Sequence, residues 1–212
     1  ALTTDQIKAL TTDEVVALTN TQATAISATQ AAALTTLQLN KMESDDLRSL
    51  TTSAIRALAS NQVNNLSSDQ IGALTNAQVA ALSTTQLSNI TSDALNALTT
   101  DQIPSLTSTQ IAAIGTTQLT KMTTDDLQAI TTSGIRSLTT DQIKALTTDE
   151  IVALTAAQAA ALSSTQAAAL TTLQLTKMES DDLRALTTTA IRALSSTQVN
   201  NLTSDEIGQL TN

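Results

Sequence analysis

The amino-acid sequence predicts an all-α protein: a tightly wound solenoid of short helices, with one helix in each eight-residue repeat. Three observations lead to this prediction. An eight-residue period runs through the whole chain, and each period contains a signal that starts a helix. The charged residues are also sorted along each period in the direction that a helix favours.

The eight-residue period is unbroken from Ala1 to Asn212, so we interpret residues 1–212 as a single continuous array of 26 octads and half of another. Its first units read ALTTDQIK, ALTTDEVV and ALTNTQAT. The second position is Leu, Ile or Met in all 27 instances, and the seventh is a large aliphatic residue in 22 of 26. Two apolar side chains at a fixed spacing in every octad predict a continuous hydrophobic core.

A longer period lies over the octads. Residues 1–76 recur with few changes as residues 137–212, an offset of 136 residues or 17 octads. The octad KMESDDLR is identical in the two copies, where it begins at Lys41 and at Lys177. We interpret the second copy as a duplicated segment. The alternative is that similar octads align after whole turns of a superhelix.

Each octad carries a signal that starts a helix. Thr or Ser occupies the third position in 23 of 27 octads, and Gln or Glu occupies the sixth in 19 of 26. In the first octad these residues are Thr3 and Gln6, which would form a capping box. The Thr hydroxyl would accept from the Gln6 backbone N–H, and the Gln side chain would accept from the Thr3 backbone N–H. Leu2 and Ile7 then take the two positions of a hydrophobic staple.

The charged residues support the same helix boundaries. All 19 acidic residues lie at positions three, five or six, in the cap or first turn of each proposed helix. All ten Lys and Arg residues lie at position eight or position one, near the C-terminal end of a proposed helix. The helix dipole stabilises both placements, by about 0.3–1 kcal/mol for each well-placed charge.

Three other conformations fit the pattern less well. In one long helix, eight residues overshoot two turns by roughly 80°, so the Leu stripe would wind around the whole cylinder. In a β-solenoid, the alternative fold class, positions two and seven lie on opposite faces of a strand and cannot share a core. Gly and Pro, which the turns of such a fold use, number only four and one. A disordered chain would not keep so strict an apolar pattern.

Helices of about six residues do not persist alone, so the stability of the array must come from stacking one coil on the next. We expect a Leu, Ile and Val core and an exterior of Thr, Ser, Asp and Gln. Neither end carries a polar capping repeat and the sequence starts without Met, so we expect a fragment or a mature product. Exposed end coils predict head-to-tail self-association, the kind of contact that builds filaments.

A few residues depart from the octad pattern, and we expect each to be tolerated at a cost of about 1 kcal/mol. Pro104, at position eight, would remove a backbone hydrogen bond late in its helix. Glu43 and Glu179 replace the capping Thr, Ala59 and Gly115 lack a side-chain cap, and Gly134 replaces the Gln of the box. The alternative is that each of these residues marks a bend.

The composition excludes most enzymes. The chain has no His, Cys, Phe, Tyr or Trp, and His and Cys are the usual general bases, nucleophiles and soft metal ligands. We therefore predict no enzyme, no catalytic, cofactor-binding or metal-binding residues, and no cofactor. A net charge of −9 argues against nucleic acid as a partner. No apolar run approaches the roughly 18–20 residues that span a bilayer, so membrane insertion is not expected.

Tandem octads of the form A-L-T-T-x-Q-[IV]-x are carried here by ALTTDQIK (1–8), ALTTDEVV (9–16) and ALTTDQIP (97–104). They resemble the repeat regions of very large bacterial secreted or surface proteins of adhesin type, some of which are labelled as haem-utilisation proteins. The resemblance covers the whole chain. It implies an extracellular or cell-surface location in a bacterium and a role as stalk, matrix or filament element.

Haem, calcium and ice are three ligands that parts of the sequence suggest, and a structural role explains each of those parts better. Axial sulfur for a haem could come only from methionines at the core Leu position, which we interpret as core residues: Met42, Met122 and Met178. Calcium needs six to eight oxygen ligands on a shaped loop. The first helical turn explains the acidic pairs better: Asp45–Asp46, Asp125–Asp126 and Asp181–Asp182. Consecutive Thr residues suggest ice binding, but their place in the cap and first turn explains them better.

The sequence therefore predicts a structural repeat protein that forms an extracellular stalk, spacer or head-to-tail filament. The alternative is a binding or adhesion module that recognises a protein or glycan through the solenoid surface. Exposed positions remain Thr, Ser, Asp, Ala and Asn instead of varied large side chains, which favours the structural role.

Overall fold

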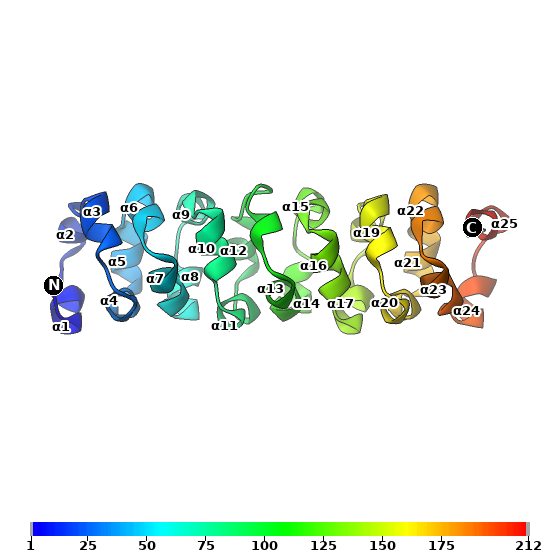
Figure 1. Cartoon of the computed structure of the whole chain (residues 1–212), viewed down its shortest axis with the longest axis horizontal. Helices are drawn as coiled ribbons and strands as arrows, with labels where there is room; N and C mark the ends of the chain where they lie inside the picture. The colour runs from blue at the N-terminus through cyan, green and yellow to red at the C-terminus, as the bar shows by residue number, and fades with distance from the viewer. Residues whose placement is uncertain (1, 211–212) are drawn as a thin grey trace. The chain divides into compact units, whose positions relative to one another are not determined.

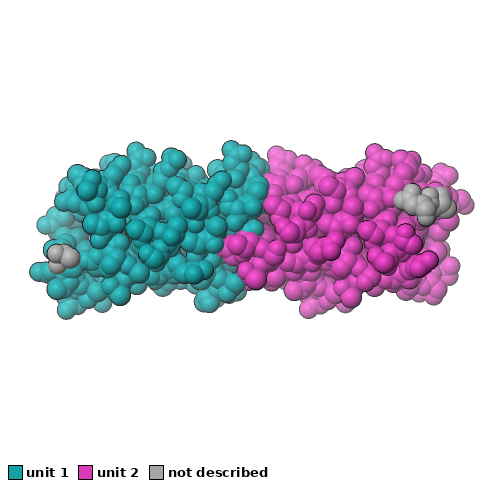
Figure 2. Space-filling model, in the orientation of Figure 1, with its two compact units in different colours: residues 1–106 teal, residues 107–212 magenta. Residues whose placement is uncertain are grey.

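The computed structural model describes residues 2–210, and within that range it contains short helices and no strand (Figure 1). The chain comprises two compact units, unit 1 (residues 1–106) and unit 2 (residues 107–212), shown in Figure 2. The boundary lies between the second and third residues of the octad SLTSTQIA (105–112). Each unit is a helical solenoid. The predicted all-α fold is confirmed, and the β-solenoid alternative is wrong.

Each octad of unit 1 contributes one short helix. The helices in its described residues are α1 (Thr4–Ala9), α2 (Thr12–Val16), α3 (Asn20–Thr24), α4 (Ala28–Ala33), α5 (Thr36–Lys41), α6 (Ser44–Ser49), α7 (Thr52–Ala57), α8 (Ser60–Asn64), α9 (Ser68–Ala73), α10 (Asn76–Ala81), α11 (Thr84–Ser88), α12 (Ser92–Asn96) and the 3-10 helix η1 (Ile103–Ser105).

Unit 2 repeats the same design. The helices in its described residues are α13 (Ser108–Ala113), α14 (Thr116–Leu119), α15 (Thr124–Ala129), α16 (Thr132–Ser137), α17 (Thr140–Ala145), α18 (Thr148–Val152), α19 (Ala156–Ala161), α20 (Ser164–Ala169), α21 (Thr172–Lys177), α22 (Ser180–Ala185), α23 (Thr188–Arg192), α24 (Ser196–Asn200) and α25 (Ser204–Gln209).

The capping box sets where each α-helix begins. Thr3 has extended backbone, and its hydroxyl accepts from the Gln6 backbone N–H at 3.2 Å. The Gln6 Oε1 accepts from the Thr3 backbone N–H at 2.8 Å. The same arrangement recurs at other α-helices where Thr or Ser at position three is followed by Gln or Glu at position six. In the octad of Pro104 only half of it forms: the Gln102 Oε1 accepts from the Thr99 N–H, but the Gln102 N–H donates to the Thr99 carbonyl. The predicted helix start is therefore confirmed, with position three as the N-cap and position four as the first helical residue.

The chain turns between helices through two extended residues. After α9, Leu74 has φ −57° and ψ 141°, and Thr75, the next N-cap, has φ −72° and ψ 155°. The Leu74 N–H donates to the Ile71 carbonyl at 3.1 Å, which closes the helix. No residue in the described part of the chain has a positive φ. The turns therefore need no Gly, which explains how the array forms with so few of them.

Helices three places apart in the chain pack side by side within each unit. In unit 1, α4 packs against α7 and α7 against α10, and in unit 2, α13 packs against α16 and α19 against α22 (Figure 1). Hydrogen bonds between adjacent coils join residues that are 25 to 31 positions apart. One coil therefore takes between three and four octads.

Positions two and seven of the octads form the core, as predicted. Most of these residues are buried, and Leu87, Leu119 and Ile151 have no exposed surface. Burying one such side chain contributes about 1.5–3 kcal/mol. The three methionines are 2–6% exposed, which confirms them as core residues: Met42, Met122 and Met178.

The departures from the pattern change single octads and leave the coils in place. Pro104 has a larger effect than predicted, because its octad forms only η1 in place of an α-helix. Proline has no N–H to donate back along the helix, and its ring crowds the preceding turn. Several helices begin without a side-chain cap, yet they form: those that follow Glu43, Ala59, Gly115 and Glu179.

Candidate functional site

The acidic pairs do not form a metal centre. In each pair the first carboxylate is exposed and the second is buried, so the two side chains point to different environments: Asp45–Asp46, Asp125–Asp126 and Asp181–Asp182. Across residues 2–210, no three Asp, Glu, His or Cys side chains come close enough together to hold a metal ion.

Within residues 2–210, no helix has both the length and the apolar character needed to cross a bilayer.

The sixth residue of the octad is the polar group that joins one coil to the next. The Gln78 Oε1 accepts from the Thr75 N–H at 2.9 Å, which completes the capping box. On the other side of the same amide, Nε2 donates to carbonyl oxygens of the preceding coil. The acceptors are Leu47 at 3.0 Å, Arg48 at 3.2 Å and Leu50 at 2.8 Å.

This arrangement recurs along both units, and we call it the glutamine ladder. Its members are buried and donate Nε2 to carbonyl oxygens 28 to 31 residues earlier: Gln38, Gln62, Gln70, Gln78, Gln86, Gln102, Gln142, Gln158, Gln166, Gln174 and Gln198.

The ladder solves the problem that short helices create. Every helix leaves about four carbonyls at its C-terminus without an intrahelical partner, and a six-residue helix consists mostly of such ends. One ladder Gln satisfies the N-terminus of its own helix and the C-terminus of a helix one coil earlier. Because the Gln78 side chain is 1% exposed, water does not compete for these bonds. Each bond contributes about 0.5–1.5 kcal/mol.

The sequence pattern predicted only the capping half of this role. The signal for the other half was the choice of amide over acid at position six, where Gln occurs in 16 octads and Glu in three. Glu caps a helix as well as Gln does, so capping alone does not explain the preference. A buried donor facing backbone carbonyls explains it, because a carboxylate has no N–H to give.

Two carboxylates at position six leave a buried oxygen unpaired. The Glu150 Oε2 accepts from the Thr147 N–H at 2.6 Å and from the Thr147 hydroxyl at 2.9 Å. Its Oε1, at the place where a ladder Gln carries its Nε2, is buried and has no hydrogen-bond partner among the described residues. The Asp182 Oδ2 is likewise buried and unpaired there. An unpaired buried acceptor costs about 1–3 kcal/mol.

Two carboxyls at position six have pKa values shifted in opposite directions. Burial raises the pKa of Asp182 to about 6, and the charges of Glu179 and Asp181 contribute in the same direction. Glu14 is exposed in the first coil of unit 1, where the hydrogen bond from the Thr11 backbone N–H lowers its pKa and the Thr11 hydroxyl adds to the effect.

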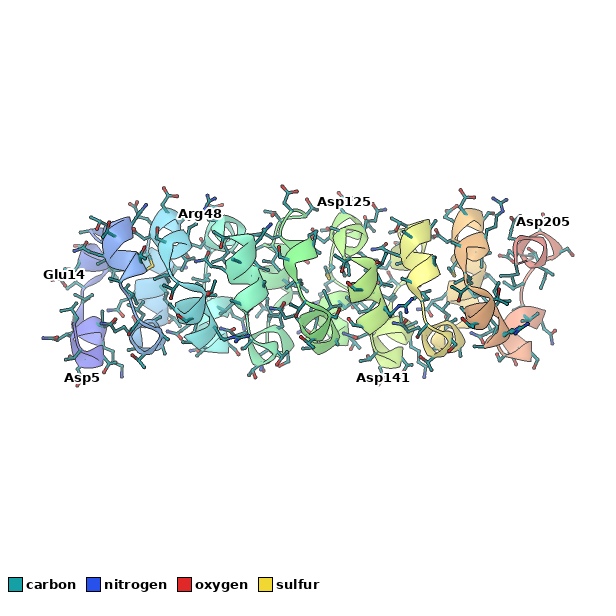
Figure 3. The ribbon with its side chains drawn as sticks, in the orientation of Figure 1. Asp5, Glu14, Arg48, Asp125, Asp141 and Asp205 are labelled. Carbon is teal, nitrogen blue, oxygen red and sulfur yellow. The ribbon has the colours of Figure 1, made fainter. Side chains whose placement is uncertain are left out.

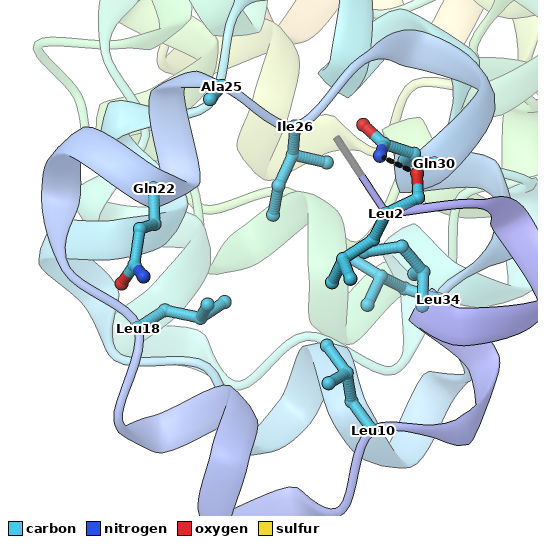
Figure 4. A pocket seen from close by; sticks show the side chains of 9 residues that line it. Leu2, Leu10, Leu18, Gln22, Ala25, Ile26, Gln30 and Leu34 are labelled. Carbon is cyan, nitrogen blue, oxygen red and sulfur yellow. Dashed lines mark hydrogen bonds between the residues drawn. The ribbon is translucent and has the colours of Figure 1, made fainter.

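The first coil of unit 1 exposes the face by which later coils pack on their predecessors. Gln6 and Gln22 form capping boxes, but their Nε2 atoms have no hydrogen-bond partner within residues 2–210. Beside Gln22 lies a mainly apolar hollow of about 250 Å³, into which core-position side chains point (Figure 4). Its lining includes Leu2, Leu10, Leu18, Ile26 and Leu34.

The repeat pattern seen in the fold is a known one. The sequence matches the family model of the ALTTAQ repeat over residues 39–76, 76–108, 119–156 and 175–212. The chain belongs to the ALTTAQ repeat family. No curated protein matches the sequence significantly. The matched ALTTAQ segments contain ladder residues of both units, among them Gln62, Gln142 and Gln198.

The exterior of the ALTTAQ octads is small, polar and repetitive. The acidic side chains at position five are exposed and project away from the helices, as Asp5, Asp125 and Asp141 do in Figure 3. Four of the exposed large apolar side chains form two pairs, each 136 residues apart: Val16 with Val152 and Leu37 with Leu173. A salt bridge on this exterior joins Asp181 to Arg184 at 2.8 Å.

Proposed function

We propose that this chain is a structural segment of an extracellular bacterial protein, in which ALTTAQ repeats serve as a stalk or spacer and join head to tail into filaments. The glutamine ladder is the observation that carries this proposal. Positions two, six and seven of the octad are committed to binding coil to coil, by apolar contact and by amide donors. The remaining positions carry mainly Ala and small polar or charged side chains, so each added octad contributes length and no new chemistry.

The exposed first coil supports the head-to-tail part of the proposal. Gln6 and Gln22 offer amide donors beside an apolar hollow, which is the surface that a preceding coil covers elsewhere in the array. The matching acceptors are carbonyls at positions seven and two of a coil, such as Ile191 and Leu194. In the described residues, no side-chain amide donates to these two carbonyls. One more coil of the same repeat, from adjoining octads or from a second copy, would extend the ladder.

Electron microscopy of the purified chain, together with its mass measured by light scattering over a range of concentrations, tests the proposal. We expect elongated particles whose mass rises with concentration in multiples of the chain. Compact globules would contradict the spacer role. A constant monomer mass would contradict head-to-tail association.

A matched pair of variants locates the contact. Leu2→Glu places a charge on the first-coil face, where Leu2 is 46% exposed, and we expect it to abolish the concentration dependence. Leu37→Glu places the same charge on the outside of a coil, where Leu37 is 60% exposed, and we expect association to persist. Loss of association in Leu37→Glu alone would indicate side-by-side adhesion instead. Protease treatment of intact cells of the source bacterium tests the extracellular location, because an intracellular chain would be protected.

A further inference from the structure

Two octads combine a buried carboxylate with an acidic N-cap. Both read KMESDDLR, with Glu43 capping the helix that contains Asp46 and Glu179 capping the helix that contains Asp182. Each Asp is 3% exposed. Asp is one methylene shorter than Gln, and the Asp182 Oδ2 has no hydrogen-bond partner in residues 2–210. These side chains therefore occupy ladder positions without bonding to the coil before them.

The third octad of this type shows what the acidic cap removes. In KMTTDDLQ the cap is Thr123, whose hydroxyl donates to the Asp126 Oδ2 at 2.7 Å. Asp126 is also buried, at 5% exposure, but its carboxylate has a donor. Replacing that Thr by Glu takes the donor away and adds a second negative charge at the same helix terminus.

The packed neighbours of Asp182 provide no compensating positive charge. Its helix, α22, packs against α19, which has no titratable residue, and against α25. The charged groups of α25, of α22 and its cap, and of the end of α21 are Asp205, Glu206, Glu179, Asp181, Arg184 and Lys177. Of the two cations, Arg184 is paired with the exposed Asp181.

Asp46 has similar surroundings in unit 1. Its helix, α6, packs against α3, which has no titratable residue, and against α9. The charged groups of α9, of α6 and its cap, and of the end of α5 are Asp69, Glu43, Asp45, Arg48 and Lys41.

We propose that the Glu43–Asp46 and Glu179–Asp182 pairs are proton-binding points that strengthen the stacking of their coils when the surroundings acidify. At neutral pH each pair holds a buried Asp carboxylate beside a second negative charge, and in the Glu179–Asp182 pair one Asp oxygen is also buried without a hydrogen-bond partner. A proton on the Asp removes that charge and converts one oxygen into a donor. The proposal rests on the fold alone and does not depend on the function proposed above.

The direction of the effect follows from the folded-state pKa. The ordinary pKa of the Asp182 carboxyl is 3.8, and burial raises it to about 6. The pKa of Asp46 is raised as well, by burial first and then by the charges of its two acidic neighbours. The folded state then binds the proton more tightly than the unfolded state, so stability rises as the pH falls through about 6. This is opposite to ordinary acid denaturation.

Thermal unfolding followed by circular dichroism, at about pH 7.5 and about pH 5, tests the proposal. We expect the wild-type Tm to be several degrees higher at the lower pH. In Asp46→Asn/Asp182→Asn the Tm at the higher pH should rise and most of the pH dependence should disappear. Glu43→Thr/Glu179→Thr, which keeps both Asp residues and restores the hydroxyl donor, should also reduce the pH dependence of the Tm.

Asp45→Asn/Asp181→Asn is the matched control, because it removes the same number of charges from exposed neighbours. We expect it to keep most of the pH dependence, as should Asp126→Asn. Carboxyl carbon NMR gives a direct reading, with Asp182 expected to titrate near 6. A wild-type Tm that falls steadily on acidification, an unchanged pH dependence in Asp46→Asn/Asp182→Asn, or an Asp182 midpoint near 4 would each overturn the proposal.

Discussion

The sharpest test of the glutamine ladder is the isosteric substitution Gln78→Glu. It keeps the size of the side chain and the oxygen that accepts from the Thr75 N–H at 2.9 Å. It replaces the Nε2 donor by an oxygen that faces the Leu47, Arg48 and Leu50 carbonyls, which lie 2.8–3.2 Å from the amide nitrogen. Any loss of stability therefore measures the bonds between coils and not the cap.

The expected loss is large for a change of one atom. The substitution removes the bonds to the preceding coil, each of which contributes about 0.5–1.5 kcal/mol, and it leaves a buried acceptor unpaired. We expect a loss of about 3 kcal/mol in the free energy of unfolding. For a chain of this size that corresponds to a fall in Tm of about 6–12 °C.

Gln22→Glu provides the control within the same unit. Gln22 is exposed and makes the same capping bonds, but its Nε2 has no partner among the described residues. We expect a change within about 0.5 kcal/mol, as for other surface substitutions.

Circular dichroism melts of Gln78→Glu, Gln22→Glu and the wild type give the Tm difference, and hydrogen exchange locates it. In Gln78→Glu, backbone amide exchange should accelerate most, relative to the wild type, in α6 and α10, the two helices that the Gln78 side chain joins. Equal melting of the two variants would refute the ladder as a source of stability. A large loss without faster exchange in α6 would refute its assignment to contacts between coils.

Other substitutions test single features by the same melts. Glu150→Gln supplies the missing donor and should raise stability by about 1–3 kcal/mol, whereas Asp149→Asn on the exposed side should leave it nearly unchanged. Leu87→Ala empties a fully buried position and should lower stability by about 2–5 kcal/mol, while Leu37→Ala, at an exposed position, should have little effect. Ala59→Ser restores a side-chain cap and should add about 0.5–2 kcal/mol. A fall in the free energy of unfolding in Glu150→Gln or in Ala59→Ser would contradict the hydrogen bond assigned to that position.

The helix boundaries were predictable because their signals are local. Thr3 and Gln6 are three residues apart, and the bonds between them join residues of a single octad. The same holds for the acidic first turns and for the core assignment of Met42, which follows from its place in the octad. Because nearly every octad carries the same signals, one irregular residue such as Pro104 changes its own octad and not the fold.

The buried carboxylates were only partly predictable. The sequence places Asp181 and Asp182 in a first helical turn, where the helix dipole favours both. It does not reveal that one is exposed and the other buried without a donor, because that difference depends on which face of α22 packs against α19 and α25.

The sequence by itself determined the octad, the cap and the two apolar positions, because each of these depends on residues within eight of one another. Only the tertiary structure decided which coil each glutamine reaches. The acceptors of Gln78 lie 28 to 31 residues earlier, and that spacing is set by how many octads complete one coil. Capping and periodicity do not predict the number of octads in one coil, because that number results from the packing of helices that are distant in the chain.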